Sequence, residues 1–166
     1  MQSGRVIHTF EPIFDKNSRI LILGTIPSVK SREEGFYYGN PRNRFWTVVS
    51  NLLRYPEPET IPHKKAMLAD AGIALFDVLA ACDIAGSADT SIKDPIPNDF
   101  SDIFHTADIR MVFANGKKAH ALYCKLCLPK TGRECRVLPS TSPANAAMTL
   151  EMLEEGWTQI LDYLGK

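Results

Sequence analysis

The chain has 166 residues, 45% of them hydrophobic, and its 19 basic and 19 acidic side chains give a formal net charge of zero. This length predicts one domain, residues 1–166. The balanced charge means that the protein as a whole does not attract nucleic acid or an anionic membrane, so contact with nucleic acid needs a local basic patch. No apolar run has the length of a membrane-spanning helix and no signal region follows the N-terminus, which predicts a cytoplasmic protein with no membrane partner.

A first strand is predicted at residues 19–23, where the apolar run is almost continuous, as in a parallel sheet covered on both faces. The following loop, residues 24–39, is too rich in glycine and aromatic residues for a helix. A helix is expected to begin at Pro41 or Arg42, where a proline is tolerated. Apolar residues then recur at helical spacing: Phe45, Val48, Val49 and Leu52.

The rest of the chain alternates between strand and helix patterns. Strands are predicted at 72–79, 109–114 and 134–138, and helices at 62–71, 117–128 and 147–164. Residues 82–100 are rich in Asp, Ser, Gly and Pro, which predicts a long connection with a helix beginning near Asn98. Long loops in compact domains are usually functional. The last helix carries an apolar stripe expected to pack in the core: Leu150, Leu153, Trp157, Ile160, Leu161 and Leu164.

This alternation predicts an α/β fold with three layers, α/β/α, around a central, mainly parallel four-stranded sheet. Ligands bind at the carboxyl ends of the strands in such sheets. Here those ends would present polar residues along one edge: Thr25 to Ser28, Asp77, Asn115 and Ser140 to Asn145. No GxGxxG, P-loop, GxSxG or HExxH motif accompanies them, so a dinucleotide enzyme or an NTPase is not indicated.

The four cysteines and four histidines do not suggest a metal site. Cys124 and Cys127 form a CxxC at the end of a predicted helix, and no second closely spaced pair follows. A redox CxxC would instead be expected at a helix N-terminus. We therefore expect buried free thiols, no metal and no cofactor. None of the histidines adjoins a predicted strand end in sequence, and His8, His63, His105 and His120 are expected to be surface or packing residues.

Three segments resemble the motifs of the uracil-DNA glycosylase superfamily, and they come in that family's order. They are residues 24–46, with the turn Gly24-Thr25-Ile26-Pro27 and the run Pro41-Arg42-Asn43-Arg44-Phe45-Trp46; the strand end 112–117; and the turn 138–145. Ile26 stands where mismatch-specific members carry an asparagine, and no histidine lies between Val137 and Asn145. These departures make the chain most similar to the hypoxanthine-DNA glycosylase branch, family 6.

This resemblance implies an enzyme, a monofunctional DNA glycosylase that uses water to release a deaminated base, most closely hypoxanthine, from DNA. It implies that Asn43, the asparagine of Pro-x-Asn, acts in catalysis. Base binding is expected from Thr25, Ile26, Tyr38 and Asn115. Contacts with DNA phosphate or with the duplex are expected from Ser28, Ser140, Thr141, Ser142, Pro143, Ala144 and Asn145. A monomer is expected.

The chemistry of N-glycosidic cleavage suits these residues. Positive charge develops on the deoxyribose and negative charge on the departing base, so the site needs a placed water and hydrogen-bond donors. An amide such as Asn43 can accept a proton of that water, and Asn115 or backbone N–H groups can donate to the base. Stacking on Tyr38, at about 1–3 kcal/mol, is comparable with the few kcal/mol that base extrusion costs.

Structural interpretations stay open beside these roles. Asn43 could cap a helix, Asn115 could form a plain turn, and Tyr38 could be core. Asp77 is either a structural acid or a catalytic one. Basic residues near the motifs could follow a DNA backbone: Lys30, Arg32, Arg42, Arg44, Lys117 and Lys118. Two other functions remain, a uracil or G·U mismatch-specific glycosylase and a non-catalytic nucleic-acid-binding domain of the same fold.

Overall fold

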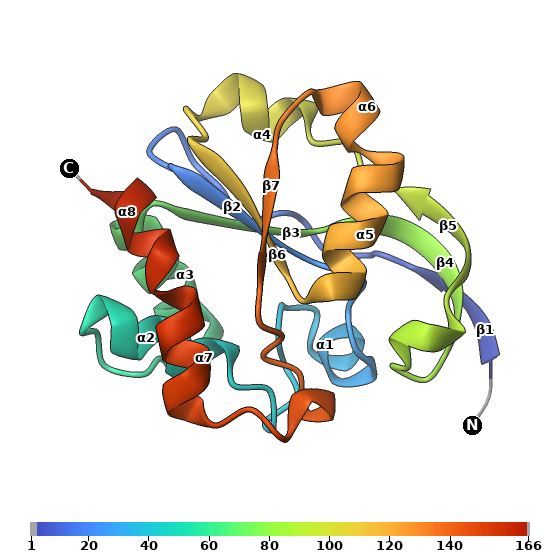
Figure 1. Ribbon diagram of the computed structural model, residues 1–166, viewed down its shortest axis with the longest axis horizontal. Coiled ribbons are helices and arrows are strands. Elements are labelled where there is room, and N and C mark those ends of the chain that lie inside the picture. Colours follow the sequence, from blue (N-terminus) through green and yellow to red (C-terminus); the bar gives the residue numbers. More distant parts are fainter. Residues whose placement is uncertain (1–2, 166) are drawn as a thin grey trace.

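The computed structural model describes residues 3–165, and strands and helices alternate along it (Figure 1). The strands are β1 (Ser3–Ile7), β2 (Ile20–Gly24), β3 (Ile73–Asp77), β4 (Leu79–Ala85), β5 (Lys93–Pro97), β6 (Met111–Asn115) and β7 (Cys135–Leu138). The helices are α1 (Val29–Glu34), α2 (Phe45–Leu53), α3 (Ile61–Ala71), α4 (Ser101–Thr106), α5 (Lys117–Leu126), α6 (Leu128–Thr131), α7 (Leu150–Trp157) and α8 (Leu161–Leu164). Short 3-10 turns are η1 (Asp89–Ser91), η2 (Pro143–Asn145) and η3 (Thr158–Ile160).

The central sheet has four strands in the order β3-β2-β6-β7, and every neighbouring pair is parallel. Gly24 lies opposite Asp77, and Asn115 lies opposite Leu138, so the strand ends are level with one another. The chain adds β3 on one side of β2 and later adds β6 on the other side. The strand order therefore reverses between β2 and β6, the position where open α/β sheets bind ligands. The predicted fold class is confirmed.

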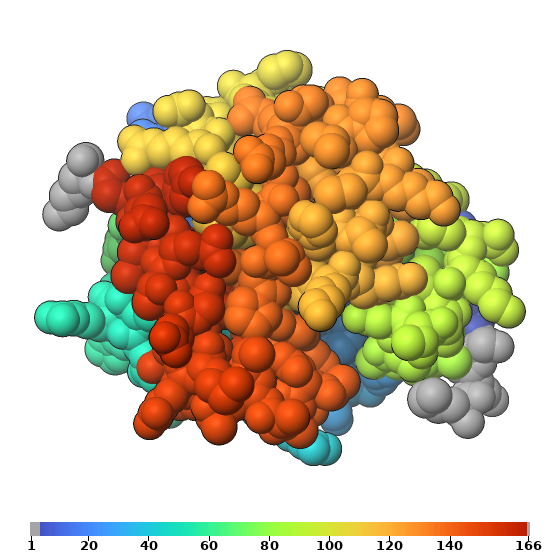
Figure 2. Space-filling view, viewed as in Figure 1, coloured from blue at the N-terminus to red at the C-terminus, as the bar shows by residue number. Residues whose placement is uncertain are grey.

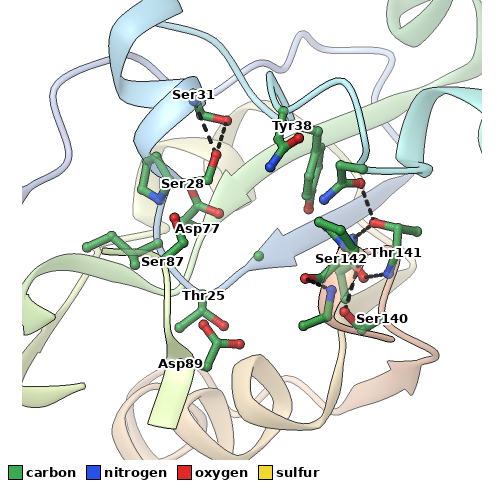
Figure 3. Close-up of a pocket in the computed structure, with 18 of the residues that line it drawn as sticks. Thr25, Ser28, Ser31, Tyr38, Asp77, Ser87, Asp89, Ser140, Thr141 and Ser142 are labelled. Carbon is green, nitrogen blue, oxygen red and sulfur yellow. Dashed lines mark hydrogen bonds between the residues drawn. The ribbon is translucent and has the colours of Figure 1, made fainter. Parts of the chain in front are cut away.

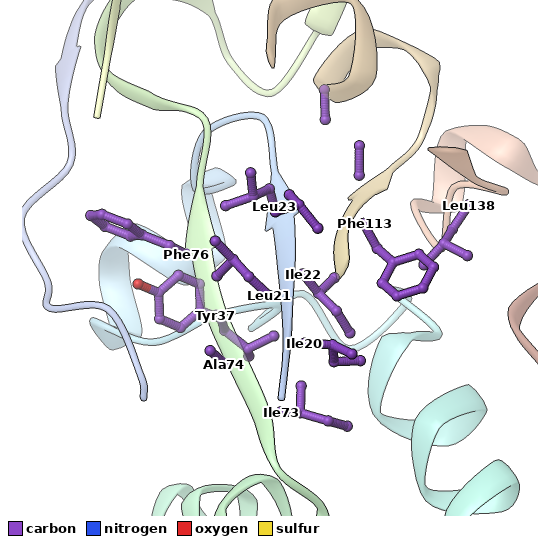
Figure 4. Packing of buried hydrophobic residues seen from close by; sticks show 14 of the residues in the cluster. Ile20, Leu21, Ile22, Leu23, Tyr37, Ile73, Ala74, Phe76, Phe113 and Leu138 are labelled. Atoms are coloured by element: carbon purple, nitrogen blue, oxygen red, sulfur yellow. The ribbon is translucent and has the colours of Figure 1, made fainter. Parts of the chain in front are cut away.

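Helices cover both faces of this sheet, which explains the almost uniformly apolar strands (Figure 1). All five residues of β2 are buried, and Leu21 and Ile22 point to opposite sides of the strand (Figure 4). Helix α5 packs along β6 and β7, α3 packs against β3, and α2 packs against α7. Both sides of β2 therefore lie in hydrophobic core, as expected for a parallel strand.

A second sheet, antiparallel and three-stranded, was not predicted. Its order is β1-β4-β5, and β1 pairs with β4 from Ser3 opposite Ala85 to Ile7 opposite Ala81. The interpretation of residues 82–100 as one long connection was therefore wrong at residues 82–85 and 93–97, which belong to strands β4 and β5. Strand β5 contains Pro95 and Pro97, which usually break strands and are tolerated here because β5 is an edge strand.

Several helix boundaries also differ from the prediction. Helix α1 lies inside the segment 24–39 predicted as loop; the Ser28 hydroxyl caps it by accepting from Ser31 N at 3.2 Å, and Gly35 ends it in the left-handed conformation. Helix α2 begins at Phe45, later than predicted. The C-terminal helix is divided into α7, η3 and α8, and Leu161 of the predicted apolar stripe is 37% exposed. Within residues 3–165, no helix is long and apolar enough to cross a membrane.

Candidate active site

A cavity of about 400 Å³ opens at the carboxyl ends of the four parallel strands (Figure 3). Its volume falls in the range of pockets that hold small-molecule ligands. Asn145 is the one residue predicted for the site that does not line this cavity. The predicted residues that do line it are Thr25, Ile26, Ser28, Tyr38, Asn43, Asn115, Ser140, Thr141, Ser142, Pro143 and Ala144.

Thr141 links the two candidate asparagines through a chain of hydrogen bonds. Asn115 Nδ2 donates to Thr141 Oγ1 at 2.9 Å, and that hydroxyl donates to Asn43 Oδ1 at 2.7 Å. The Thr141 backbone N–H donates to Asn115 Oδ1 at 3.0 Å. Thr141 has no exposed surface, so these bonds are sheltered from water and hold both amides in place. The Thr141 hydroxyl, predicted to contact DNA, is committed to this network.

The orientation of the Asn43 amide follows from its neighbours. The backbone N–H of Phe45 can only donate, and it lies 2.9 Å from the same Asn43 atom that accepts the Thr141 hydroxyl, so that atom is the carbonyl oxygen. Asn43 therefore also satisfies the first N–H of α2, from the position just before the N-cap residue Arg44. Among the described residues, Asn43 Nδ2 has no hydrogen-bond partner. The amide nitrogen, rather than the carbonyl oxygen, is free for a ligand.

Tyr38 has the geometry of a stacking platform. Its ring lies nearly parallel to that of Phe45, with 4.1 Å between centroids and 19° between planes, and it stands beside the cavity (Figure 3). Its backbone is left-handed, with φ 53°, a strained conformation for tyrosine. The indole N–H of Trp46 donates to the Tyr38 carbonyl at 3.2 Å and helps to hold that conformation. The ring is therefore rigidly supported from the side of the core.

Gly24 allows two polar side chains to approach the end of β2. A Cβ atom at this position would lie 2.5 Å from Asp77 Oδ1 and 3.2 Å from the Tyr38 hydroxyl, so a larger residue would displace both. The Tyr38 hydroxyl is enclosed and has no hydrogen-bond partner within residues 3–165. Burial raises the pKa of Tyr38 well above its ordinary value, and the negative charge of Asp77 raises it further. Tyr38 is therefore protonated at neutral pH.

Asp77, at the end of β3, forms a buried pair with His8. His8 Nε2 lies 2.8 Å from Asp77 Oδ2, and the side chains are 3% and 5% exposed. Because an ionised carboxylate only accepts hydrogen bonds, the imidazole donates through Nε2. His8 reaches this place because it directly follows β1, and its backbone N–H donates to Ala80 O at 2.8 Å. The sequence could not show this proximity, since the two residues are 69 positions apart.

The turn after β7 is fixed by its own hydrogen bonds. Ser140 Oγ accepts from Ser142 N at 3.1 Å, and Ser142 Oγ accepts from Ala144 N at 3.1 Å. Asn145 Nδ2 donates to Ser140 O at 3.0 Å, which accounts for its position off the cavity. Each serine hydroxyl keeps its own hydrogen for a further acceptor, such as a phosphate oxygen. Capping and ligand binding by Ser140 and Ser142 are therefore compatible.

Arg44 holds this turn by hydrogen bonds from inside the protein. Its guanidinium donates to the carbonyl oxygens of Met148 and Asn145, the latter at 3.1 Å, and its backbone N–H donates to Thr141 O at 3.0 Å. These contacts join the start of α2 to the turn after β7. Arg44, considered above as a residue that could follow a DNA backbone, therefore uses two of its guanidinium nitrogens to hold the turn.

One wall of the cavity comes from the β4–η1 segment, which the sequence analysis did not include in the site. Ser87 Oγ accepts from the backbone N–H of Val29 at 3.2 Å and so joins this wall to α1. Figure 2 shows the yellow-green segment and the orange-red turn after β7 on opposite sides of a hollow, with blue residues between them. The polar composition of residues 82–100 is the sequence feature that could have indicated this wall of the cavity. The lining residues from this wall are Ile84, Ser87, Ala88, Asp89 and Thr90.

The cysteines lie apart from the cavity lining and are all free. Cys82, Cys127 and Cys135 are buried, and burial raises the pKa of the Cys127 thiol to about 11 and that of Cys135 to about 12. Both thiols are therefore protonated at neutral pH. In the part of the chain that the structure describes, no group of three or more His, Cys, Asp or Glu side chains is arranged to hold a metal ion.

Comparison with known proteins identifies the family of this fold and cavity. The family model of the Uracil DNA glycosylase superfamily matches residues 11–164. The chain belongs to the uracil DNA glycosylase superfamily. This span contains all three segments that carried the resemblance in the sequence, so the predicted family is confirmed.

Individual relatives within the superfamily resemble the chain over most of its length. A hypoxanthine DNA glycosylase from Methanosarcina acetivorans is 38% identical over 138 residues, 82% of this chain and 86% of that protein. A hypoxanthine DNA glycosylase from Methanosarcina barkeri is 33% identical over 153 residues, 90% of this chain and 94% of that protein. The solution NMR structure of a candidate uracil DNA glycosylase from M. acetivorans superposes with a TM-score of 0.79 at 35% identity, covering 93% of this chain and 96% of the other.

Proposed function

We propose that this protein releases hypoxanthine from DNA by hydrolysing the N-glycosidic bond of deoxyinosine. The observation that carries the proposal is the cavity at the strand ends, where a supported aromatic ring and a fixed pair of amides come together. The relatives named hypoxanthine DNA glycosylase support the choice of base. Base extrusion is required because the scissile bond is otherwise inaccessible within the duplex stack.

In the proposed mechanism, the extruded base stacks on Tyr38. Phe45 supports the opposite face of that ring, so the platform does not have to be ordered when DNA binds. Stacking of a base on an aromatic side chain contributes about 1–3 kcal/mol, which offsets much of the cost of extrusion. A base in a weak pair, such as one with inosine, is the least costly to extrude.

Asn43 acts in this mechanism as a hydrogen-bond donor. Its Oδ1 is occupied by Phe45 N–H and by the Thr141 hydroxyl, which leaves Nδ2 to donate to the departing base as its bond to the sugar breaks. A donor fixed before the reaction stabilises developing negative charge without reorganising. The positive charge on the deoxyribose makes the sugar reactive toward water itself, so a strong base is not required to deprotonate the water first. Orientation then supplies a large part of the acceleration.

The turn after β7 is the proposed contact with the DNA backbone. Ser140 and Ser142 each have a hydroxyl hydrogen available for phosphate, and Pro143 and Ala144 lie at the rim of the cavity, where they can enter the space left by the extruded base. Arg44 and the indole of Trp157 hold this turn, the latter by donating to Pro139 O at 2.8 Å. The turn is therefore preorganised for a duplex.

We also propose that the protein works as a monomer on DNA in the cytoplasm. All residues of the proposed site come from one chain, so no second copy is needed to complete it. Size-exclusion chromatography with light scattering measures the mass directly, and a dimer at assay concentration would contradict this part of the proposal. Fractionation of cells that produce the protein tests the compartment.

The activity is tested with duplexes that carry one inosine, uracil, xanthine or ethenoadenine, followed by chemical cleavage at abasic sites. Excision of inosine in preference to uracil is the expected result. Excision of uracil alone would contradict the proposed base and indicate a uracil or mismatch-specific enzyme. Tight binding without any product would indicate a non-catalytic DNA-binding domain.

A further inference from the structure

Asp77 and Asp89 are the acidic side chains that line the cavity, and the proposed mechanism gives neither a role; of the two, Asp77 lies at the end of a parallel strand. The Asp77 side chain is 5% exposed, yet the residue lines the cavity that would receive the base. A buried carboxylate is costly unless it is paired, and His8 supplies one partner through Asp77 Oδ2. The backbone oxygen of Asp77 accepts from Asn98 Nδ2 at 2.9 Å, which also fixes the end of β3.

The second carboxylate oxygen, Asp77 Oδ1, is available to a ligand. Among residues 3–165 it has no hydrogen-bond partner, and unlike the Tyr38 hydroxyl it is not sealed from the cavity. It lies over Gly24, at the strand end where the absence of a side chain leaves room. Asp77 therefore presents a single fixed acceptor to the cavity, since His8 restrains the rest of the carboxylate.

His8 is itself rigidly packed, which makes this acceptor precise in direction. Aromatic rings surround the imidazole, with centroid distances of 4.6 Å to Phe10, 5.9 Å to Tyr37 and 5.2 Å to Phe76. Tyr37 in turn donates its hydroxyl to the Glu11 carbonyl at 2.8 Å. A carboxylate held by a packed imidazole loses little freedom when it binds a ligand.

Deamination changes the hydrogen-bonding character of a base at one ring nitrogen. Adenine and cytosine are amidines, and the ring nitrogen beside the amino group is an acceptor. In hypoxanthine and uracil the same nitrogen carries a hydrogen beside a carbonyl, as a lactam, and is a donor. Enzymes that extrude a base recognise it by hydrogen bonds to this Watson–Crick edge. A fixed acceptor in the pocket therefore favours the deaminated base over its parent.

We propose that Asp77 is a specificity residue that accepts a hydrogen bond from the lactam N–H of the deaminated base, and that His8 positions it. This inference rests on the proposed function and extends it to the means by which parent bases are rejected. An amidine base in the same orientation would place a lone pair against the Asp77 carboxylate, and such a mismatch of buried polar groups is the strongest basis for rejection.

The test compares free bases as ligands of the intact protein, which does not depend on turnover. Hypoxanthine and uracil are titrated against adenine and cytosine by NMR chemical-shift perturbation, with the wild type and with Asp77→Asn. For the wild type, each lactam is expected to bind at least about tenfold more tightly than its amidine parent. In Asp77→Asn this preference is expected to shrink by about tenfold or more, because an amide can turn its NH2 toward an acceptor.

The same variant is assayed for excision from inosine duplexes under single-turnover conditions. Its rate is expected to fall by about 10- to 100-fold relative to the wild type. His8→Gln keeps an N–H donor for Asp77 and is expected to lose less of the lactam preference than His8→Leu. Thermal unfolding followed by circular dichroism shows whether each variant is folded.

The outcomes separate this inference from the proposed function. Equal affinity of the wild type for lactam and amidine bases would overturn the inference, and this measurement needs no variant. So would an Asp77→Asn protein that is folded and keeps the wild-type preference for lactam over amidine bases, since a residue that acted only on the water would leave that preference unchanged. Failure of the wild type to excise any base would contradict the proposed function instead.

Discussion

Asn43 and Tyr38 owe their place in the site to contacts that are distant in sequence. The Asn43 amide is oriented by Thr141, 98 positions later, together with the adjacent Phe45 N–H. The sequence predicted Asn43 as the catalytic residue, and it also showed that Asn43 lies near the start of a helix. Its donor orientation was not predictable, because it depends on which buried hydroxyl meets the carbonyl oxygen. That orientation decides whether Asn43 acts in catalysis as a hydrogen-bond donor or as an acceptor.

The first prediction uses Asn43→Asp, which keeps the acceptor for Phe45 N–H and Thr141 but replaces the Nδ2 donor by an oxygen. If donation by Nδ2 matters, excision falls by about 100- to 1,000-fold, the usual effect of removing one preorganised donor. Single-turnover kinetics on an inosine duplex measure this loss. Activity of Asn43→Asp equal to or above the wild type would show that an acceptor is needed here.

Asn43→Ala serves as the companion variant. It also loses the capping bond and leaves the Thr141 hydroxyl without its acceptor, so it is expected to lower the free energy of unfolding by about 1–3 kcal/mol, whereas Asn43→Asp is not. Urea denaturation of the two variants separates this structural role from the role in excision.

The second prediction concerns the ring of Tyr38. Tyr38→Ala removes the platform and is expected to slow excision by about 10- to 100-fold, which corresponds to the loss of one stacked base. Tyr38→Phe keeps the ring and removes a buried hydroxyl that has no partner among the described residues, so most of the activity and at least the wild-type stability are expected. Similar rates for Tyr38→Ala and the wild type would remove Tyr38 from base binding.

At the scale of elements, the parallel strands were predictable and the antiparallel ones were not. The runs that form β2, β3 and β6 are almost entirely apolar because helices cover both sides of the sheet. The ends of these strands were also readable, at Gly24, Asp77 and Asn115, as was Pro139 directly after β7. The pairing of β1 with β4 depends on contacts between distant segments, and the prolines of β5 concealed an edge strand. The β4–η1 wall and the His8–Asp77 pair were missed for this reason.

Helix α7 and the turn after β7 approach each other at Gly156. A Cβ atom there would lie 2.5 Å from Pro139 Cγ, and the proline ring cannot turn aside. Gly156→Ala is therefore expected to destabilise the protein by about 1–3 kcal/mol, despite the gain of up to about 1 kcal/mol that alanine brings to a helix.

Gly165→Ala is the control for this third prediction, because a Cβ at that position has no atom of the described residues within 4 Å, its chain neighbours aside. Its effect is expected to stay within about 0.5 kcal/mol. Urea unfolding measures both variants under the same conditions. Equal stability of the two would contradict the close packing of α7 against Pro139.

At the scale of the whole molecule, a formal net charge of zero requires that DNA be held by local charges. Lys117 begins α5 two residues after Asn115, which lines the cavity, and Arg42 immediately precedes Asn43. Lys125 lies in the last turn of α5, away from the strand ends. The hydrogen bond from Arg44 to the Asn145 carbonyl holds the turn after β7. The overall charge could not predict it, because it joins segments about a hundred residues apart.

The fourth prediction is a steep dependence of DNA affinity on salt. With about three or four phosphate contacts, the slope of log K against log salt concentration is expected near −3, since each contact contributes about −0.9. Fluorescence anisotropy measures the slope for the wild type, Lys117→Gln and Lys125→Gln. Only the first variant should reduce it, by about one unit. A flat response for the wild type would argue against a DNA-binding face at this edge.

Hydrolysis of the N-glycosidic bond of deoxyinosine can be measured through the free base that it releases. The protein is incubated in excess with a duplex containing one inosine, and the solution is analysed by mass spectrometry for the released base while the strand is checked for an abasic site. We expect one equivalent of free hypoxanthine and one intact abasic strand, with no strand cleavage by the protein itself. An unchanged inosine strand, under conditions in which the folded protein binds the duplex, would contradict it.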